Sequence, residues 1–109
     1  MTVTPNYLWV DDRRDPAEFG YAGALWVRDP QTAIQILKDN PGFFHEMSLD
    51  HDMGFTEGND GYAIILYLEE SGAWPEGGVR VHSSNTAARD RMLVPIRAHY
   101  GRDFQWGLD

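Results

Sequence analysis

Short apolar runs alternate with helical patterns along this chain. The strands that these runs predict lie at residues 7–10, 25–27, 43–49 and 79–81. Apolar spacing, together with capping and stop signals, predicts helices at residues 30–38, 62–70 and 86–100. The string Leu-Trp-Val occurs in both of the first two strands, as a short local repetition and not an internal repeat. Strands that alternate with helices indicate an α/β fold with a parallel sheet, and ligands of such folds bind at the carboxyl ends of the strands.

Three details set the limits of the predicted fold. Residues 15–18 read Asp-Pro-Ala-Glu, the pattern of a helix start, but two nearby glycines keep that helix short. Pro95 removes a backbone donor from the last helix, so we expect a kink there. Residues 103–108 are long enough for one weak edge strand at most. We therefore expect one domain over residues 1–109, with three layers, four or five parallel strands and a truncated C-terminal end.

The composition narrows the classes of function. The chain has no cysteine, which excludes disulfides, thiolate metal sites and a cysteine nucleophile. Its formal net charge of −8 argues against a protein that coats nucleic acid, because such binding depends on Lys and Arg, but a short end or a free nucleotide still fits. The chain shows no signal-peptide pattern and no apolar stretch of the ~18 residues that a membrane span needs, so we expect a soluble, cytoplasmic protein without membrane contact.

Polar side chains directly follow three of the predicted strands. In chain order these segments are Asp11-Asp12, Asp50-His51-Asp52 and His82-Ser83-Ser84-Asn85. Because the carboxyl ends of parallel strands meet at one edge of a sheet, we expect the three segments to converge on one pocket.

The acid pair and the acid after the third strand are the candidate metal ligands: Asp11, Asp12 and Asp50. Three carboxylates aimed at one point repel one another, so burying them together is costly unless a cation is present. Mg²⁺ suits this set because it takes one or two carboxylates together with water and phosphate oxygens, and Mn²⁺ is the alternative ion. The structural alternative is that two of these acids only cap the helices that follow them.

Histidines beside the acids are candidates for proton transfer. His51 directly follows Asp50, and histidine titrates near working pH, so it could act as a general acid or base while Asp52 orients it or adds a metal ligand. His82, at the end of the fourth strand, could protonate a leaving oxygen. The structural alternatives are a His51 that only ties down its loop and a His82 that is a hydrogen-bonded core residue.

Phosphate binding is expected at the end of the fourth strand and on the rim of the acid pair. The candidates are Arg13, Ser83, Ser84, Asn85 and Arg89. The Ser-Ser-Asn segment precedes a helix, where one side chain caps the helix and backbone N–H groups form an anion site. Arg89 could add bidentate contacts, and Arg13 or Arg14 could reach a phosphate from the rim. The alternatives are a solvated helix face for Arg89 and, for the other two arginines, neutralisation of nearby acids.

The order of these motifs resembles the receiver domains of two-component signalling. Receivers have a strand that ends in paired acids, a later strand that ends in the phospho-accepting aspartate, and a fourth that ends in Ser or Thr. In this chain those positions look like Asp11 and Asp12, Asp50, and Ser83. More closely, "LWVDD…DP", "SLDHDMG" and "HSSN" with a downstream "RDRM", over residues 8–92, resemble the cyclic-phosphate-processing receiver-like domains, a branch found in bacteria and phages.

The resemblance implies a receiver-like (flavodoxin-like) fold and the processing of cyclic phosphate. On this basis we expect a Mg²⁺-dependent phosphoesterase whose partner is a phosphate-bearing nucleotide or an RNA end. Two departures favour this over signalling. Receivers carry a lysine after their fifth strand, but the chain has no lysine after Lys38, so that role is vacant or passes to an arginine such as Arg89. The final helix of a receiver, which often binds the output partner, is also missing.

Two other functions stay open. One is a phospho-accepting or pseudo-receiver module that works by binding a protein partner. The other is a protein that sequesters a cyclic nucleotide without turning it over, with the same phosphate contacts. Fold resemblance alone does not separate these from catalysis.

Overall fold

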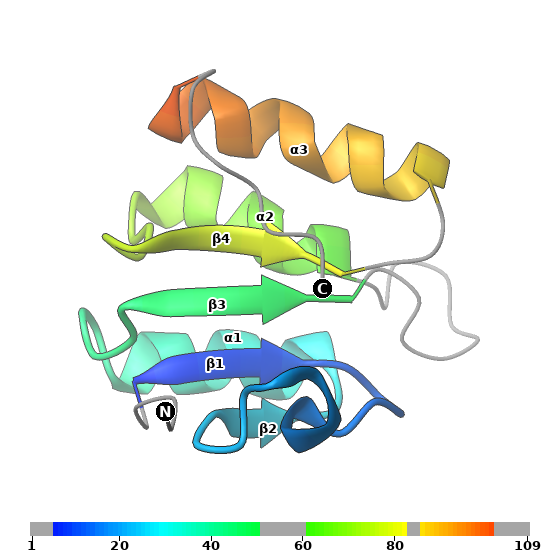
Figure 1. The fold of residues 1–109 in the computed structure, drawn as a ribbon. Coiled ribbons are helices and arrows are strands. Elements are labelled where there is room, and N and C mark those ends of the chain that lie inside the picture. The colour runs from blue at the N-terminus through cyan, green and yellow to red at the C-terminus, as the bar shows by residue number, and fades with distance from the viewer. Residues whose placement is uncertain (1–5, 51–60, 83–85, 102–109) are drawn as a thin grey trace.

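The computed structural model describes residues 6–50, 61–82 and 86–101 (Figure 1). Its elements, in chain order, are β1 (Tyr7–Val10), the 3-10 helix η1 (Pro16–Phe19), β2 (Leu25–Val27), α1 (Pro30–Asp39), β3 (Glu46–Leu49), α2 (Gly61–Ser71), β4 (Gly78–Val81) and α3 (Thr86–Tyr100). The four strands form one parallel sheet in the order β2-β1-β3-β4. The protein therefore has an α/β receiver-like fold, as the order of its motifs implies.

Helices cover one face of the sheet. α1 and α2 lie behind the sheet in Figure 1, and α3 runs along the β4 edge, where it contacts α2. Alternate strand positions meet these helices in one buried core, which includes Leu8, Val10, Met47, Leu49, Val79 and Val81 from the strands and Ala33, Leu37, Ile64, Ile65, Leu68, Met92 and Ile96 from the helices. β1, in the middle of the sheet, reads as a continuous apolar run because all four of its residues are buried.

The opposite face of the sheet has a thinner cover. Trp9 is fully buried there, and its ring packs against Phe19 and Tyr21, with centroids 5.7 and 5.4 Å away. These two aromatic residues come from η1 and the turn after it, which lie in front of the sheet in Figure 1. Asp15 caps η1, and Gly20 ends it with a φ of 89°. The first crossover is thus the short helix that the sequence predicts, and it forms the third layer.

The third strand begins later than predicted, at Glu46 instead of Phe43. After α1 the chain makes a turn in which the Phe43 N–H donates to the carbonyl of Asn40, and Gly42 has a φ of 75°. The chain is therefore still turning at Phe43. The apolar pair that suggested a strand packs edge to face instead, with the rings of Phe43 and Phe44 5.0 Å apart.

The remaining elements agree with the predicted ranges to within one residue. α2 extends the predicted helix by one residue at each end and is followed by Gly72, whose φ is 72°. α3 spans the predicted range and continues through Pro95, which is buried. The segment 103–108 lies outside the described residues. No helix within the three described ranges is both long and apolar enough to cross a membrane.

Candidate functional site

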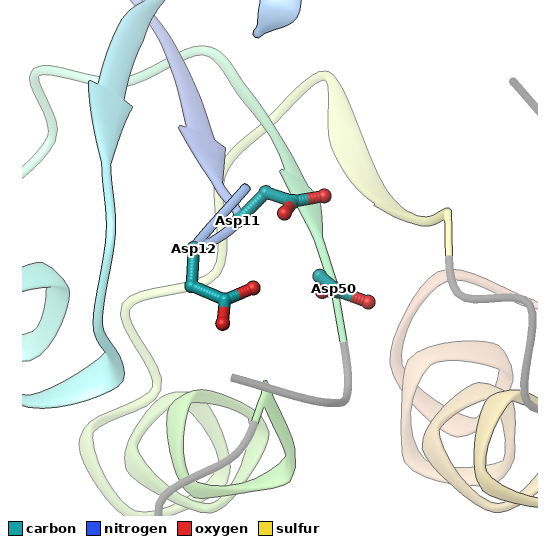
Figure 2. A group of neighbouring side chains, drawn as sticks. All are labelled: Asp11, Asp12 and Asp50. Atoms are coloured by element: carbon teal, nitrogen blue, oxygen red, sulfur yellow. The ribbon is translucent and has the colours of Figure 1, made fainter. Parts of the chain in front are cut away.

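The acidic residues meet at the carboxyl edge of the sheet. Asp11 and Asp12 follow β1 and Asp50 follows β3, and these two strands pair with Val10 opposite Leu49. The backbone N–H of Asp50 donates to the carbonyl of Val10 at 2.9 Å. Each of the three carboxyl groups has an oxygen within 4.8 Å of an oxygen of the other two, and the groups surround a common space in Figure 2.

Asp11 is held by hydrogen bonds on both carboxylate oxygens and on its carbonyl. Oδ1 accepts from the backbone N–H groups of Arg13 and Arg14, at 2.8 and 2.9 Å, and Oδ2 accepts from Nε2 of His82 at 2.9 Å. The carbonyl accepts from the indole N–H of Trp26 at 2.8 Å. Burial alone would raise the pKa of Asp11, but the bond with His82 and the two backbone N–H bonds outweigh it and hold the pKa below its usual value. Asp11 is therefore a fixed, ionised carboxylate.

His82 is enclosed by its neighbours. Its Nδ1 lies 2.6 Å from Oγ of Ser48, and the ring of Trp9 stacks on the imidazole with centroids 4.1 Å apart. Because ionised Asp11 has no proton to give, Nε2 of His82 is the donor between them, and Nδ1 of a neutral ring then accepts from the Ser48 hydroxyl. His82 is only 8% exposed. These contacts favour a hydrogen-bonded core histidine that positions Asp11 over one that exchanges protons with a substrate.

Asp12 has a buried oxygen without a hydrogen bond. No donor of the described residues reaches its Oδ1, and Nε of Arg13 is 3.9 Å away. A buried carboxylate oxygen without a donor is costly. A divalent cation would remove this cost, and carboxylate oxygens such as those of Asp11, Asp12 and Asp50 are the ligands that hard cations prefer. The three aspartates could therefore bind a metal.

The two arginines after the acid pair lie in different surroundings. The side chain of Arg13 is 82% exposed, whereas that of Arg14 is 33% exposed and lies beside Asp11 and Asp50. Nη1 of Arg14 donates to the carbonyl of His82 at 2.9 Å. The same nitrogen lies 3.7 Å from Oδ2 of Asp11 and 3.9 Å from Oδ1 of Asp50. Arg14 thus supplies positive charge between two of the three carboxylates.

Ser48 is a site residue that the sequence reasoning missed. It is fully buried within β3 and contacts His82, as described above. A signal for it exists, because side chains two residues apart in a strand share a face, and Ser48 stands two residues before Asp50. A lone hydroxyl in the apolar run of a strand, on the face of a functional acid, indicates a polar network beneath the site.

The other predicted site residues are only partly placed. Residues outside the described ranges are His51, Asp52, Ser83, Ser84 and Asn85, so their roles stay predictions. Arg89 is half-buried in α3, and within the described residues it forms no ion pair with the aspartates. Its phosphate-binding role also stays a prediction.

A parallel sheet with paired acids at its carboxyl edge defines a receiver-like α/β domain. Residues 6–98 match the family model described as "Cyclic-phosphate processing Receiver domain". The chain belongs to this family of receiver domains, which is related to cyclic-phosphate processing. No curated protein and no solved structure matches the chain significantly.

Proposed function

We propose that this domain is a metal-dependent phosphoesterase that hydrolyses cyclic phosphates at RNA ends or in nucleotides. The observation that carries the proposal is the buried Oδ1 of Asp12, which no donor of the described residues reaches, within a cluster of three carboxylates. Membership of the family supports the choice of substrate. The net charge of −8 favours a nucleotide or a chain end over long nucleic acid.

The three aspartates would contribute differently to metal binding. Asp12 offers its Oδ1, and Asp50 offers a carboxylate that is nearly buried at the end of β3. Asp11 accepts two hydrogen bonds at Oδ1 and one at Oδ2, so it has one lone pair of Oδ2 left for a metal. Mg²⁺, or Mn²⁺, would neutralise the phosphate charge and make the phosphorus more electrophilic when bound.

Hydrolysis of a cyclic phosphodiester needs two proton transfers. Water loses a proton as its oxygen bonds to phosphorus, and the leaving alkoxide gains one as its P–O bond breaks. His51, oriented by Asp52, is the candidate for one transfer. His82 is the candidate for the other, but its contacts with Ser48 and Asp11 favour a positioning role. The predicted phosphate contacts are Arg13, Ser83, Ser84, Asn85 and Arg89.

The test is turnover of 2′,3′-cyclic nucleotides and of RNA with a 2′,3′-cyclic end, with Mg²⁺ and with a chelator. We expect Asp12→Asn and Asp50→Asn to lower kcat/KM by ~100-fold or more, because each removes a charged ligand. Glu70→Gln is the matched control, since it removes the same charge from an exposed position on α2. Equal turnover by the wild type and Asp50→Asn would show that the assigned site is wrong.

A phospho-accepting switch is the second candidate. It is favoured by the position of Asp50, whose Oδ1 lies 3.9 Å from Nη1 of Arg14 beside the acid pair. Acetyl phosphate would then transfer its phosphoryl group to the Asp50 carboxylate and release acetate. Intact mass would detect a labile adduct that Asp50→Asn loses. Tight binding of a cyclic nucleotide without turnover would instead indicate a sequestering protein.

A further inference from the structure

We infer that Arg14 binds the phosphate group of the substrate beside the three aspartates, an inference that rests on the function proposed above. Arg14 stands beside Arg13 in the sequence, but its side chain lies among the carboxylates while that of Arg13 lies in solvent. The inference depends on three properties of Arg14: it is held in place, it has donors left over, and it lies beside the metal ligands.

Arg14 is fixed at three points along its length. Its backbone N–H donates to Oδ1 of Asp11 at 2.9 Å, and its carbonyl accepts from the indole N–H of Trp9 at 2.9 Å. Its Nη1 donates to the carbonyl of His82 at 2.9 Å. A long side chain normally loses much rotamer freedom when it binds a ligand. Here that freedom is already restricted, so the guanidinium is ready to receive an anion.

The guanidinium also has donors left over. Within the described residues its contacts all run through Nη1, while Nη2 and Nε have none. A guanidinium carries five N–H donors in a planar fork, and that fork matches two oxygens of a phosphate. One third of the side chain is exposed, so Arg14 is open to a ligand from solvent.

The position of Arg14 suits a phosphate that is also bound to a metal. Nη1 lies 3.7 Å from Asp11 and 3.9 Å from Asp50, so an anion beside these carboxylates would meet a positive charge as well. The single lysine of the chain cannot take this role. Lys38 lies in the last turn of α1, and its ammonium lies over the ring of Tyr67, 5.8 Å from the centroid. The last turn of α1 is at the opposite, amino end of the sheet.

The test is calorimetric titration of inorganic phosphate into protein saturated with Mg²⁺. We expect Arg14→Gln to weaken phosphate binding by ~10–100-fold, because charge-assisted hydrogen bonds are lost. Arg97→Gln, the matched control, removes the same charge from an exposed position in the last turn of α3 and should change it by less than ~2-fold, since exposed charges interact weakly. Arg14→Lys keeps the charge without the fork and should fall between the wild type and Arg14→Gln.

Titration of Mg²⁺ alone separates a binding role from a structural one. Arg14→Gln should bind Mg²⁺ as well as the wild type or better, because a positive charge beside the aspartates is gone. Loss of phosphate and Mg²⁺ binding together would overturn the inference, as would unchanged phosphate binding in Arg14→Gln. If the variants do not fold, the Nε–H signal of Arg14 in the wild type provides the test: phosphate should shift it, and an unmoved signal would overturn the inference.

Failure of the inference and failure of the proposed function give different results. If the wild type hydrolyses cyclic phosphate but Arg14→Gln binds phosphate normally, only the role of Arg14 is wrong. If the wild type neither binds phosphate with Mg²⁺ nor hydrolyses a cyclic phosphate, both are wrong.

Discussion

The two ends of the sheet are stabilised by different means. At the amino end, Trp74 and His99 stack with centroids 4.6 Å apart, and Tyr100 packs edge-on against both. The Tyr100 hydroxyl donates to the carbonyl of Pro75, and burial raises the pKa of this phenol. At the carboxyl end, directed hydrogen bonds surround Asp11 instead. Aromatic packing stabilises the amino end. At the carboxyl end, hydrogen bonds stabilise buried charges, which would be costly to bury in an apolar environment without them.

The largest difference in stability between the two ends is expected when a glycine at each end is replaced by alanine. A Cβ at Gly61, the first residue of α2, would lie 2.1 Å from the carbonyl oxygen of Asp50 at the carboxyl end. A Cβ at Gly77, at the amino end, would lie 2.5 Å from the ring of His45 and 2.6 Å from Cγ of Glu46, both side-chain atoms that can shift more easily than backbone. We expect Gly61→Ala to lower the free energy of unfolding by ~2–3 kcal/mol and Gly77→Ala by less than ~1 kcal/mol. Urea denaturation measures both, and equal losses would contradict the contrast.

The stabilisation of the fold by a metal should depend on residues at the carboxyl end alone. With Mg²⁺ at 100 times its Kd, we expect the free energy of unfolding to rise by ~2.7 kcal/mol in the wild type, and Asp12→Asn should lose most of that gain. In chelator, Asp12→Asn should be at least as stable as the wild type, because one of three like charges is gone. Denaturation with and without Mg²⁺ measures both effects.

The control for the metal prediction lies at the other end of the sheet. Trp74→Phe changes the aromatic cluster and should keep the full Mg²⁺-dependent gain. If Asp12→Asn were less stable than the wild type in chelator, the Asp12 carboxylate would be satisfied by the protein itself. Asp12 would then be a structural acid and not a metal ligand.

A hydrogen-bonded hydroxyl at each end gives the next comparison, fully buried in Ser48 and partly buried in Tyr100. Ser48→Ala removes the partner of Nδ1 of His82 and should cost ~2 kcal/mol, because it leaves a buried polar atom unpaired. Tyr100→Phe removes the bond to Pro75 and should cost ~1 kcal/mol. Only Ser48→Ala should also weaken Mg²⁺ binding, by ~10-fold, since His82 orients Asp11. Calorimetric titration measures this, and equal Mg²⁺ affinity in the two variants would show that the orientation of Asp11 does not depend on Ser48.

The smallest effect is expected at Asp29, an acid at the carboxyl end that caps α1 and is not part of the cluster. The Thr32 hydroxyl and N–H donate to its carboxylate at 2.7 and 2.8 Å, and these bonds lower the pKa of Asp29 below 3.8. Because the folded pKa is the lower one, the cap stabilises the fold above the ordinary pKa, and its contribution is lost as pH falls through the folded value. Asp29→Ala should therefore cost ~1 kcal/mol at neutral pH and less in acid.

Denaturation of the wild type and of Asp29→Ala, from neutral pH to below the ordinary aspartate pKa of 3.8, measures the difference in their free energies of unfolding. A gap that is constant with pH would show that the Asp29 charge does not contribute. Mg²⁺ should stabilise Asp29→Ala as it does the wild type, since a cap and a metal ligand are separate roles.

The meeting of Asp11, Asp12 and Asp50 could be predicted from the sequence because it depends on strand order alone. Once the strands are parallel, the residues that follow β1 and β3 must share an edge. Strands and helices were also readable from periodicity, capping residues and glycine stops. The start of β3 was not, because an apolar pair in a turn, Phe43-Phe44, has the same composition as a strand.

Arg14 could not be separated from Arg13 by sequence, because the two are adjacent and identical. The two arginines differ in their contacts with residues far away in the sequence. Nη1 of Arg14 donates a hydrogen bond to the carbonyl of His82, 68 positions away. The indole of Trp9 holds the Arg14 carbonyl from within the sheet. Such contacts form only when β1 and β4 are already in place on either side of β3.

The repeated Leu-Trp-Val string places two tryptophans in strands beside the loop after β1, where each binds a carbonyl of that loop. Its two copies lie in register on neighbouring strands, with Trp9 opposite Trp26. The Trp26 indole donates to the carbonyl of Asp11 and the Trp9 indole to that of Arg14, so both ends of a four-residue loop are attached to an emitting ring. Any ligand that displaces this loop must break or lengthen one of these bonds. Two of the four tryptophans of the chain therefore hold this loop directly, and a ligand that displaced it would change their emission.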